Sequence, residues 1–201
     1  MKFLELNKKR HAIKHFTDQP VDPKDVRTAI EIATLAPSVH NSQPWKFVVV
    51  RQKNAELAKL AYGANYDQVM EAPVTIALFT DTDLQKRARK IARVGGVKNF
   101  TDEQLQYFMQ NLPAEFARYD AQQTSDYLAL NAGLVAMNLV LALTDQGIGT
   151  NIILGFDKSK INEVLDIEER FRPEVLITVG YAAEKVEPSY RLPVDEIIDK
   201  R

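Results

Sequence analysis

Hydrophobic positions along the chain follow two periodicities, one typical of helices and one of buried strands. A helix begins at Asp22, whose carboxylate can accept from free N–H groups of the first turn, where Pro23 also fits. Thr101 and Gln104 have the spacing of a capping box, which predicts another helix start. Continuous apolar runs such as KFVVV at 46–50 predict short buried strands. We expect helices over 2–9, 22–37, 54–62, 83–93, 101–111 and 121–146, a short helix capped by Asp157 through Leu165, and strands over 46–50, 74–79, 150–154 and 174–181.

The helix expected over 121–146 is apolar on nearly all sides in its middle. Such a helix must be covered all round, by its own domain or by a partner, and we favour both. Its apolar stretch is shorter than a typical membrane span and contains Asn131 and Asn138, so no membrane contact is expected. Helices and short strands intermix along the chain. The pattern predicts one α+β domain over 1–201, with a central, mostly antiparallel or mixed sheet flanked by helices.

Charge and composition exclude several classes of function. Lys plus Arg is 26 and Asp plus Glu is 27, a net charge of −1, whereas a general nucleic-acid binder needs a basic excess. The chain has no cysteine, which removes disulfides, thiolate nucleophiles and zinc–cysteine sites and fits a reducing compartment. The opening residues, MKFLELNKKR, lack the apolar run of a signal peptide. We therefore expect a cytoplasmic protein that does not bind nucleic acid.

Residues suited to acid–base or nucleophilic catalysis are scarce. His11 and His15 are four positions apart, as metal ligands on a helix can be, but no third ligand stands nearby, so no metal is expected. Ser38 and Ser42 lack the glycine-flanked turn of a hydrolase nucleophile. Neither of the glycine-rich nucleotide-binding motifs occurs. These absences suggest that a bound cofactor carries out any reaction here.

Two segments are candidates for binding such a cofactor. The first, RHAIKHF at 10–16, is either a solvated basic patch or an anion cradle, in which Arg10 makes a forked contact with a phosphate and Lys14 adds a charge. The second, APSVHNSQPW at 36–45, is either an ordinary turn with Trp45 in the core or a stiff loop that reads the edge of a polar planar ligand. Neither segment alone decides between its two interpretations.

Together these segments resemble the FMN-dependent nitroreductase family. Its members carry an R-[RH]-S-x-[RK]-x-F element near the start and, about twenty residues later, a helix ending in A-P-S-x-x-N-x-Q-P-W. Further similarities are Gln68 ahead of Glu-Ala-Pro at 71–73, ILGF at 153–156 and RLP at 191–193, so the resemblance covers essentially the whole chain. It implies a nitroreductase-like α+β fold and a domain-swapped homodimer with a large helical interface.

The resemblance also implies FMN as cofactor and assigns residues to it. Three positive side chains, Arg10, Lys14 and Arg191, would meet a phosphate that carries a charge near −2. Leu154 would present its backbone N–H to the reactive flavin nitrogen, N5. The implied cofactor-binding residues are Arg10, His11, Ala12 and Lys14 at the phosphate and pyrimidine edge; Pro37, Ser38, Val39 and Asn41 from the other subunit; Asn65 and Gln68 at the ring or ribityl chain; Ile153, Leu154 and Gly155 beside N5; and Ser189 and Arg191 in the tail.

No side chain is expected to be catalytic, because the flavin would take hydride from NADH or NADPH and pass it to a second substrate in an alternating scheme. That substrate would be flat and electron-poor: a nitroaromatic, a quinone or free flavin. His40, Tyr107 and Phe108 are expected to line its slot. Two alternatives remain open at this point, an oxidative flavoenzyme of the same fold and a protein that stores or senses FMN without turnover.

The chain departs from the family pattern at three positions. Ala12 stands where the family usually has serine, which removes one hydroxyl contact. Ser189 stands where lysine or arginine is frequent. Leu154 stands where some members have an acid, and this difference bears on substrate choice because that residue would face the stacked ligand.

Overall fold

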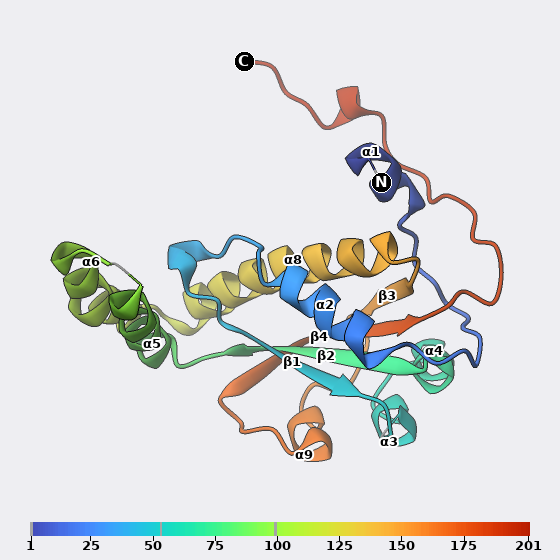
Figure 1. The fold of residues 1–201 in the computed structure, drawn as a ribbon, viewed down its shortest axis with the longest axis horizontal. Helices are drawn as coiled ribbons and strands as arrows, with labels where there is room; N and C mark the ends of the chain where they lie inside the picture. The colour runs from blue at the N-terminus through green and yellow to red at the C-terminus, as the bar shows by residue number, and fades with distance from the viewer. Residues whose placement is uncertain (1, 53, 99) are drawn as a thin grey trace.

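A computed structural model describes residues 2–52, 54–98 and 100–201, and its centre is a four-stranded sheet (Figure 1). The strands are β1 (Trp45–Val50), β2 (Val74–Asp81), β3 (Gly149–Ile153) and β4 (Phe171–Gly180). They are ordered β1-β2-β4-β3, and each neighbouring pair is antiparallel. The expected α+β class with a central antiparallel sheet is confirmed.

The two central strands are mostly buried because helices cover both faces of the sheet. All eight residues of β2 are buried. Ile76 and Leu78 point to one face of the sheet, whereas Ala77 and Phe79 point to the other, as the two-residue period of a strand requires. β1 and β3 form the two edges of the sheet.

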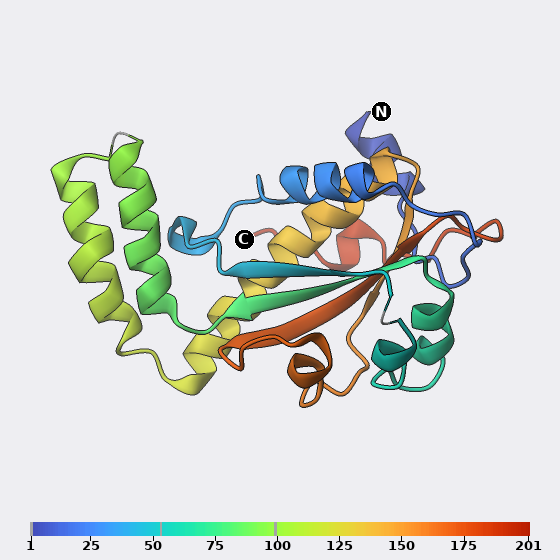
Figure 2. The same cartoon turned by 60° about the horizontal axis from the view of Figure 1, so that its bottom comes forward.

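The long helix α8 (Ala121–Asp145) crosses one face of this sheet (Figures 1 and 2). Asp120 caps it, since its carboxylate accepts from the Gln123 N–H at 2.7 Å. By length and composition α8 could span a membrane, but 67% of its most apolar window is buried inside this fold, as in the core helix of a soluble protein. The buried face of α8 includes Leu128, Val135, Leu139 and Leu143, whereas Leu130, Leu134 and Met137 are exposed.

Helix α2 (Pro23–Ala33) packs beside α8 on the same face of the sheet. The predicted cap is present: the Asp22 carboxylate accepts from the Lys24 N–H at 2.8 Å. Val26, Ala29 and Ala33, on the predicted apolar face, are all buried in the shared core. Both the start and the direction of this helix therefore follow from its sequence.

A helical arm projects from one end of the sheet (Figure 2). It consists of α5 (Leu84–Val97) and an antiparallel helical rod made of α6 (Asp102–Gln106), η2 (Tyr107–Asn111) and α7 (Leu112–Phe116). The capping box is confirmed, because the Thr101 hydroxyl and the Gln104 side chain each accept from the other's backbone N–H. The rod runs five residues beyond the predicted end at 111, and η2 within it is a π-helical turn.

Helix α2 stops at Ala33 rather than at residue 37, and α5 continues to Val97 rather than ending at residue 93. Two further predicted helices were partly wrong. The helix expected over 54–62 ends early, as α3 (Asn54–Ala58), because the chain at Ala61 and Tyr62 pairs with Phe156 and Gly155 instead. Gly63 then turns the chain with a φ of +56°, and an unpredicted helix α4 (Asn65–Glu71) follows.

The second partly wrong helix lies after β3. The Asp157 carboxylate accepts from the Ser159 N–H and hydroxyl in the preceding turn, so it does not cap α9 (Ile161–Leu165), which begins later. The last strand is also longer than expected, since it starts at Phe171 rather than at residue 174.

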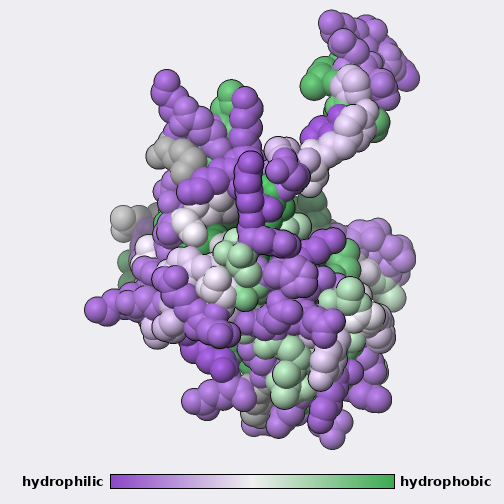
Figure 3. Space-filling view, turned by 90° about the vertical axis from the view of Figure 1, so that its right-hand side faces the viewer, coloured by the Kyte–Doolittle hydropathy of each residue, from purple (hydrophilic) through white to green (hydrophobic). Residues whose placement is uncertain are grey.

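The two ends of the chain lie beside each other, away from the sheet. α1 (Phe3–Lys9) lies near the C-terminal segment, which contains a single 3-10 turn, η3 (Val194–Glu196), among its described residues (Figure 1). From residue 187 onward every residue is exposed, including Tyr190, Leu192 and Ile197. Figure 3 shows the end of this segment standing clear of the body of the molecule.

Candidate functional site

Basic residues from both ends of the chain meet in one pocket. Arg10 and His11 follow α1, and Ser189 and Arg191 come from the C-terminal segment. The pocket has a volume of about 440 Å³, and its complete lining is Asn7, Lys8, Arg10, His11, Pro188, Ser189 and Arg191. Four predicted phosphate-site residues, almost two hundred positions apart in sequence, are therefore brought together.

The chemistry of this pocket fits a phosphate group. Its described lining contains no acidic residue, and neither Arg10 nor Arg191 forms an ion pair with a described carboxylate. The Arg191 guanidinium donates to the Tyr190 carbonyl at 2.7 Å. Two guanidinium groups supply donors in the planar arrangement that phosphate oxygens accept. Lys14, which was predicted to join them, is exposed and lies outside the lining of the pocket.

A second group of predicted residues gathers where β3 begins and ends. Ala12 forms a parallel bridge with Thr150, and the Ile13 N–H donates to the Thr150 carbonyl at 2.9 Å. Near the other end of the strand, the Asn65 side chain donates to the Gly155 carbonyl at 3.2 Å. The N-terminal segment, α4 and the residues after β3 thus line one region of the surface.

Gly155 packs closely against the Asn65 side chain. A Cβ atom there would lie 2.8 Å from Asn65 Nδ2, which is closer than real Cβ atoms approach. Beside it, the Leu154 side chain is 67% exposed, while Ile153 is buried. Leu154 is therefore directed toward solvent at the end of β3, whereas its neighbour Ile153 is directed into the core.

Gln68 has a partner that sequence reasoning missed. Its side chain is 6% exposed, and its Oε1 accepts from the Asn151 side chain. The one available signal was a polar residue inside the otherwise apolar strand TNIIL. Asn151 fixes the orientation of the Gln68 amide, with Oε1 directed toward β3.

The predicted rigid loop adopts a strained backbone. Its 3-10 turn, η1 (Val39–Asn41), contains His40 and Asn41 at φ values of +55° and +50°, and Gln43 follows at +44°. Residues other than glycine rarely hold such angles unless their surroundings over-determine them. Pro37 and Pro44 flank this loop, and hydrogen bonds also hold it in its conformation.

Two polar residues of α8 hold this loop. The Val39 N–H donates to Asn131 Oδ1 at 2.8 Å. The Tyr127 hydroxyl donates to the Val39 carbonyl at 2.6 Å and lies 2.7 Å from the Ser42 hydroxyl. In the sequence, Asn131 is visible only as a polar interruption of an apolar helix, and Tyr127 gives no signal for this role.

Of the residues predicted to line the acceptor slot, His40 lies on the loop, and Tyr107 and Phe108 lie on the arm. The His40 ring packs on Phe116 and Tyr127, with ring centroids 5.8 and 6.1 Å apart. In the π-helical turn, Phe108 is partly buried against Phe100, whereas Tyr107 is partly exposed. Their role toward a substrate stays a prediction.

Within one chain the loop and the phosphate pocket lie at opposite ends of α8 (Figure 1). The loop is fixed at Asn131, whereas residues 10–13 lie beside the start of β3, just after α8 ends at Asp145. The intervening fourteen residues of helix span about 21 Å. The two predicted parts of the flavin site are therefore not brought together by a single chain.

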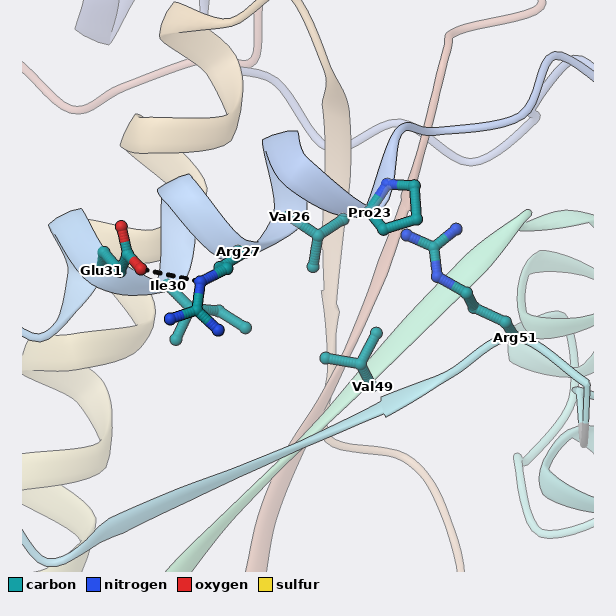
Figure 4. Close-up of a pocket in the computed structure, with 7 residues that line it drawn as sticks. All are labelled: Pro23, Val26, Arg27, Ile30, Glu31, Val49 and Arg51. Atoms are coloured by element: carbon teal, nitrogen blue, oxygen red, sulfur yellow. Dashed lines mark ion pairs between the residues drawn. The ribbon is translucent and has the colours of Figure 1, made fainter.

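A further groove lies between α2 and the edge strand β1 (Figure 4). Ile30 and Val49 form its apolar floor, and Arg27 is paired with Glu31 at 3.0 Å. Arg51 donates to the Val21 carbonyl at 2.9 Å. None of its lining residues belongs to the predicted site, and its acidic group is already paired with a base.

Comparison with known proteins places the chain in a family. The sequence profile of the Nitroreductase family matches residues 8–181. The chain belongs to the nitroreductase family. A nitroreductase-family protein of Streptococcus pneumoniae TIGR4, known from its crystal structure, is 86% identical, with a TM-score of 0.97 and 100% of both chains covered. The nitroreductase-like fold expected from the sequence is thereby confirmed.

Two further members of the nitroreductase family bear on the cofactor and the electron donor. A Streptococcus pyogenes serotype M6 protein, provisionally assigned as an NAD(P)H nitroreductase, is 67% identical over 201 residues and covers 100% of both chains. A protein of Exiguobacterium sibiricum 255-15, provisionally assigned as a nitroreductase, was solved in complex with FMN. It is 29% identical, with a TM-score of 0.90, and the match covers 100% of this chain and 98% of the other.

The loop anchor at Tyr127 has a testable ionisation. Burial raises the pKa of Tyr127 to about 12, from an ordinary value of 10.0, although the Ser42 hydrogen bond lowers it. Between these two values the phenol ionises in the unfolded chain but not in the folded one, so stability should fall as the pH rises from about 10 to 12. Tyrosinate absorbance of the wild type minus that of Tyr127→Phe should titrate near pH 12. Titration of this difference near pH 10 would show that the hydroxyl is not buried against the loop.

Proposed function

We propose that this nitroreductase-family protein is an FMN-dependent NAD(P)H oxidoreductase. The observation that carries the proposal is the acid-free pocket in which Arg10, His11, Ser189 and Arg191 converge. A doubly charged phosphate monoester is the ligand that such a donor set favours. The FMN complex of the Exiguobacterium sibiricum relative and the NAD(P)H assignment of the Streptococcus pyogenes relative support the same reading.

In this proposal the residues of the chain bind and orient the cofactor rather than react themselves. Arg10 and Arg191 would hold the phosphate, and the nearby Lys14 would place a positive charge at the pyrimidine edge of the ring. The Gln68 amide, oriented by Asn151, would face the ring or ribityl oxygens. The backbone N–H of Leu154 would lie beside N5. When bound, FMN would supply the hydride chemistry, taking hydride from NADH or NADPH and delivering it to a flat, electron-poor acceptor.

We further propose that two copies of the chain build each site. The loop anchored at Asn131 and the pocket at Arg10 lie at opposite ends of α8, so one flavin could reach both only if they come from different subunits. The exposed face of α8 offers the surface for this contact. It carries a groove of about 610 Å³, lined by Leu35, Ala36, Pro37, Ala129, Leu130, Gly133, Leu134, Met137, Asn138 and Leu141.

The acceptor slot would lie where this loop meets the arm. His40, Tyr107 and Phe108 offer aromatic surface there, which suits a nitroaromatic, a quinone or free flavin. The arm projects from one end of the sheet (Figure 2). In the proposed dimer it would border the site of the partner subunit.

Turnover tests the proposed function directly. The purified protein loaded with FMN should oxidise NADH or NADPH in the presence of a nitroaromatic or a quinone, and the rate should depend on the acceptor concentration. The measurement is the loss of nicotinamide absorbance at saturating donor. Tight FMN binding without turnover on any such acceptor would instead indicate a flavin store or sensor.

The pocket arginines should govern FMN retention. Removal of either guanidinium, in Arg10→Ala or Arg191→Ala, should raise the FMN Kd by about tenfold to hundredfold, because hydrogen bonds to charged groups contribute about 1.5–3 kcal/mol. Lys86→Ala, an exposed lysine on α5, is the matched control and should retain FMN as the wild type does. Equal FMN retention in all three variants would refute the assignment of the pocket.

The exposed face of α8 should control both assembly and flavin content. Leu134 is 36% exposed in the single chain and lines the groove. A buried, unpaired carboxylate is costly, so Leu134→Asp should convert the dimer to monomers and release FMN. Sedimentation and flavin absorbance measure the two effects, and Val97→Asp, at an exposed position on the arm, is the control. A monomeric Leu134→Asp protein that keeps its flavin would contradict the shared site.

A further inference from the structure

One arginine of the arm reaches back to the strained loop. The Arg87 Nε donates to the Ser42 carbonyl at 3.0 Å, and its Nη2 donates to the Gln43 carbonyl. Arg87 is partly buried. The other basic residues of α5, which are Lys86, Arg89, Lys90 and Arg93, are exposed. Arg87 is therefore the basic residue of this helix whose charge is directed into the protein.

This placement of a charge is unfavourable in itself. Desolvation by burial lowers the pKa of Arg87, the nearby Asp81 opposes that shift, and Arg170 adds to it. Asp81 is in turn paired with Arg170 at 3.6 Å. The hydrogen bonds that a buried charge makes must first offset the cost of removing it from water. What a guanidinium does supply is a rigid fork that fixes two acceptors relative to each other.

The two carbonyls that Arg87 holds belong to the part of the loop that most needs support. Ser42 and Gln43 directly follow His40 and Asn41, and three of these four residues have positive φ angles. Tyr127 and Asn131 of α8 hold the beginning of the loop through Val39. Arg87 holds its end from the opposite element. The strained conformation is thus fixed from both sides, by α8 and by α5.

We propose that Arg87 is a positioning residue, which locks the 38–43 loop in its flavin-binding conformation and couples the loop to the arm. The inference rests on the proposed function, because it assumes that the loop contacts FMN. In this role Arg87 would act on the cofactor through the loop, because its hydrogen bonds go to the loop carbonyls. Since the arm also carries Tyr107 and Phe108, Arg87 links the surface that would hold the ring to the surface that would admit the acceptor.

The test compares FMN binding by three variants of the full-length protein. Arg87→Met removes both hydrogen bonds and should raise the FMN Kd by about tenfold, because FMN would then have to order the loop on binding. Arg87→Lys keeps the charge but not the fork, so it should recover part of that loss. Arg89→Met makes the same chemical change on the exposed side of α5 and should bind FMN as the wild type does. Titration of the apoprotein with FMN gives the Kd values.

The visible spectrum and the midpoint potential of the bound flavin separate positioning from mere stability. A loop that has lost its fixed conformation should shift both in Arg87→Met, measured with FMN in saturating excess, and Arg89→Met should shift neither. A folded Arg87→Met protein with the wild-type Kd, spectrum and potential overturns the inference. If Arg87→Met does not fold, Arg87→Lys carries the test, and wild-type values for it overturn the inference equally. A wild type that takes up no FMN refutes the proposed function instead.

Discussion

Helix α8 constrains the rest of the structure because it is long and has a set of apolar residues on each of two faces. One face of α8 is buried against the sheet, as Leu128, Val135 and Leu139 show, while Leu130 and Leu134 on the other face lack a cover in the single chain. The same helix anchors the strained loop through Asn131 and ends beside the strand that receives the N-terminal segment. Helix α8 thus sets the distance between the strained loop and the phosphate pocket, the two candidate parts of the site. Under this constraint, a second copy of the chain would both cover the apolar face and complete the site.

The polar interactions of the candidate site serve geometry more than reactivity. Tyr127, Asn131 and Arg87 each form hydrogen bonds with backbone groups of a loop whose φ angles are unfavourable. Asn151 likewise orients Gln68, and the Asn65 side chain donates to the Gly155 carbonyl. Preorganised groups of this kind hold a cofactor without reorganisation at the moment of reaction. The scarcity of reactive side chains in the sequence agrees with such a division of labour, in which the protein orients and the cofactor reacts.

Local signals in the sequence predicted most of the fold. The cap at Asp22, the capping box at Thr101 and the apolar run of β2 each depend on neighbouring residues, so they could be read without the structure. The early end of α3 at Ala58 was not predicted, because it depends on pairing with Phe156, almost one hundred positions away. The phosphate pocket was expected from the resemblance rather than from spacing. The roles of Arg87 and Tyr127 could not be predicted, because a hydrogen bond to a distant backbone group leaves no pattern along the chain. Asn151 leaves only the weak signal of a polar residue within a strand.

The central claim, that each flavin is held by two chains, can be tested by mixing two defective subunits. One subunit carries Arg10→Ala with Arg191→Ala and lacks the phosphate pocket; the other carries Tyr127→Phe with Asn131→Ala and lacks the fixed loop. Differently tagged mixed dimers are isolated and titrated with FMN. If the sites are shared, each mixed dimer regains one intact site, and it should bind one FMN with wild-type affinity. Mixed dimers that bind FMN no better than either defective parent would show that each site is built by a single chain.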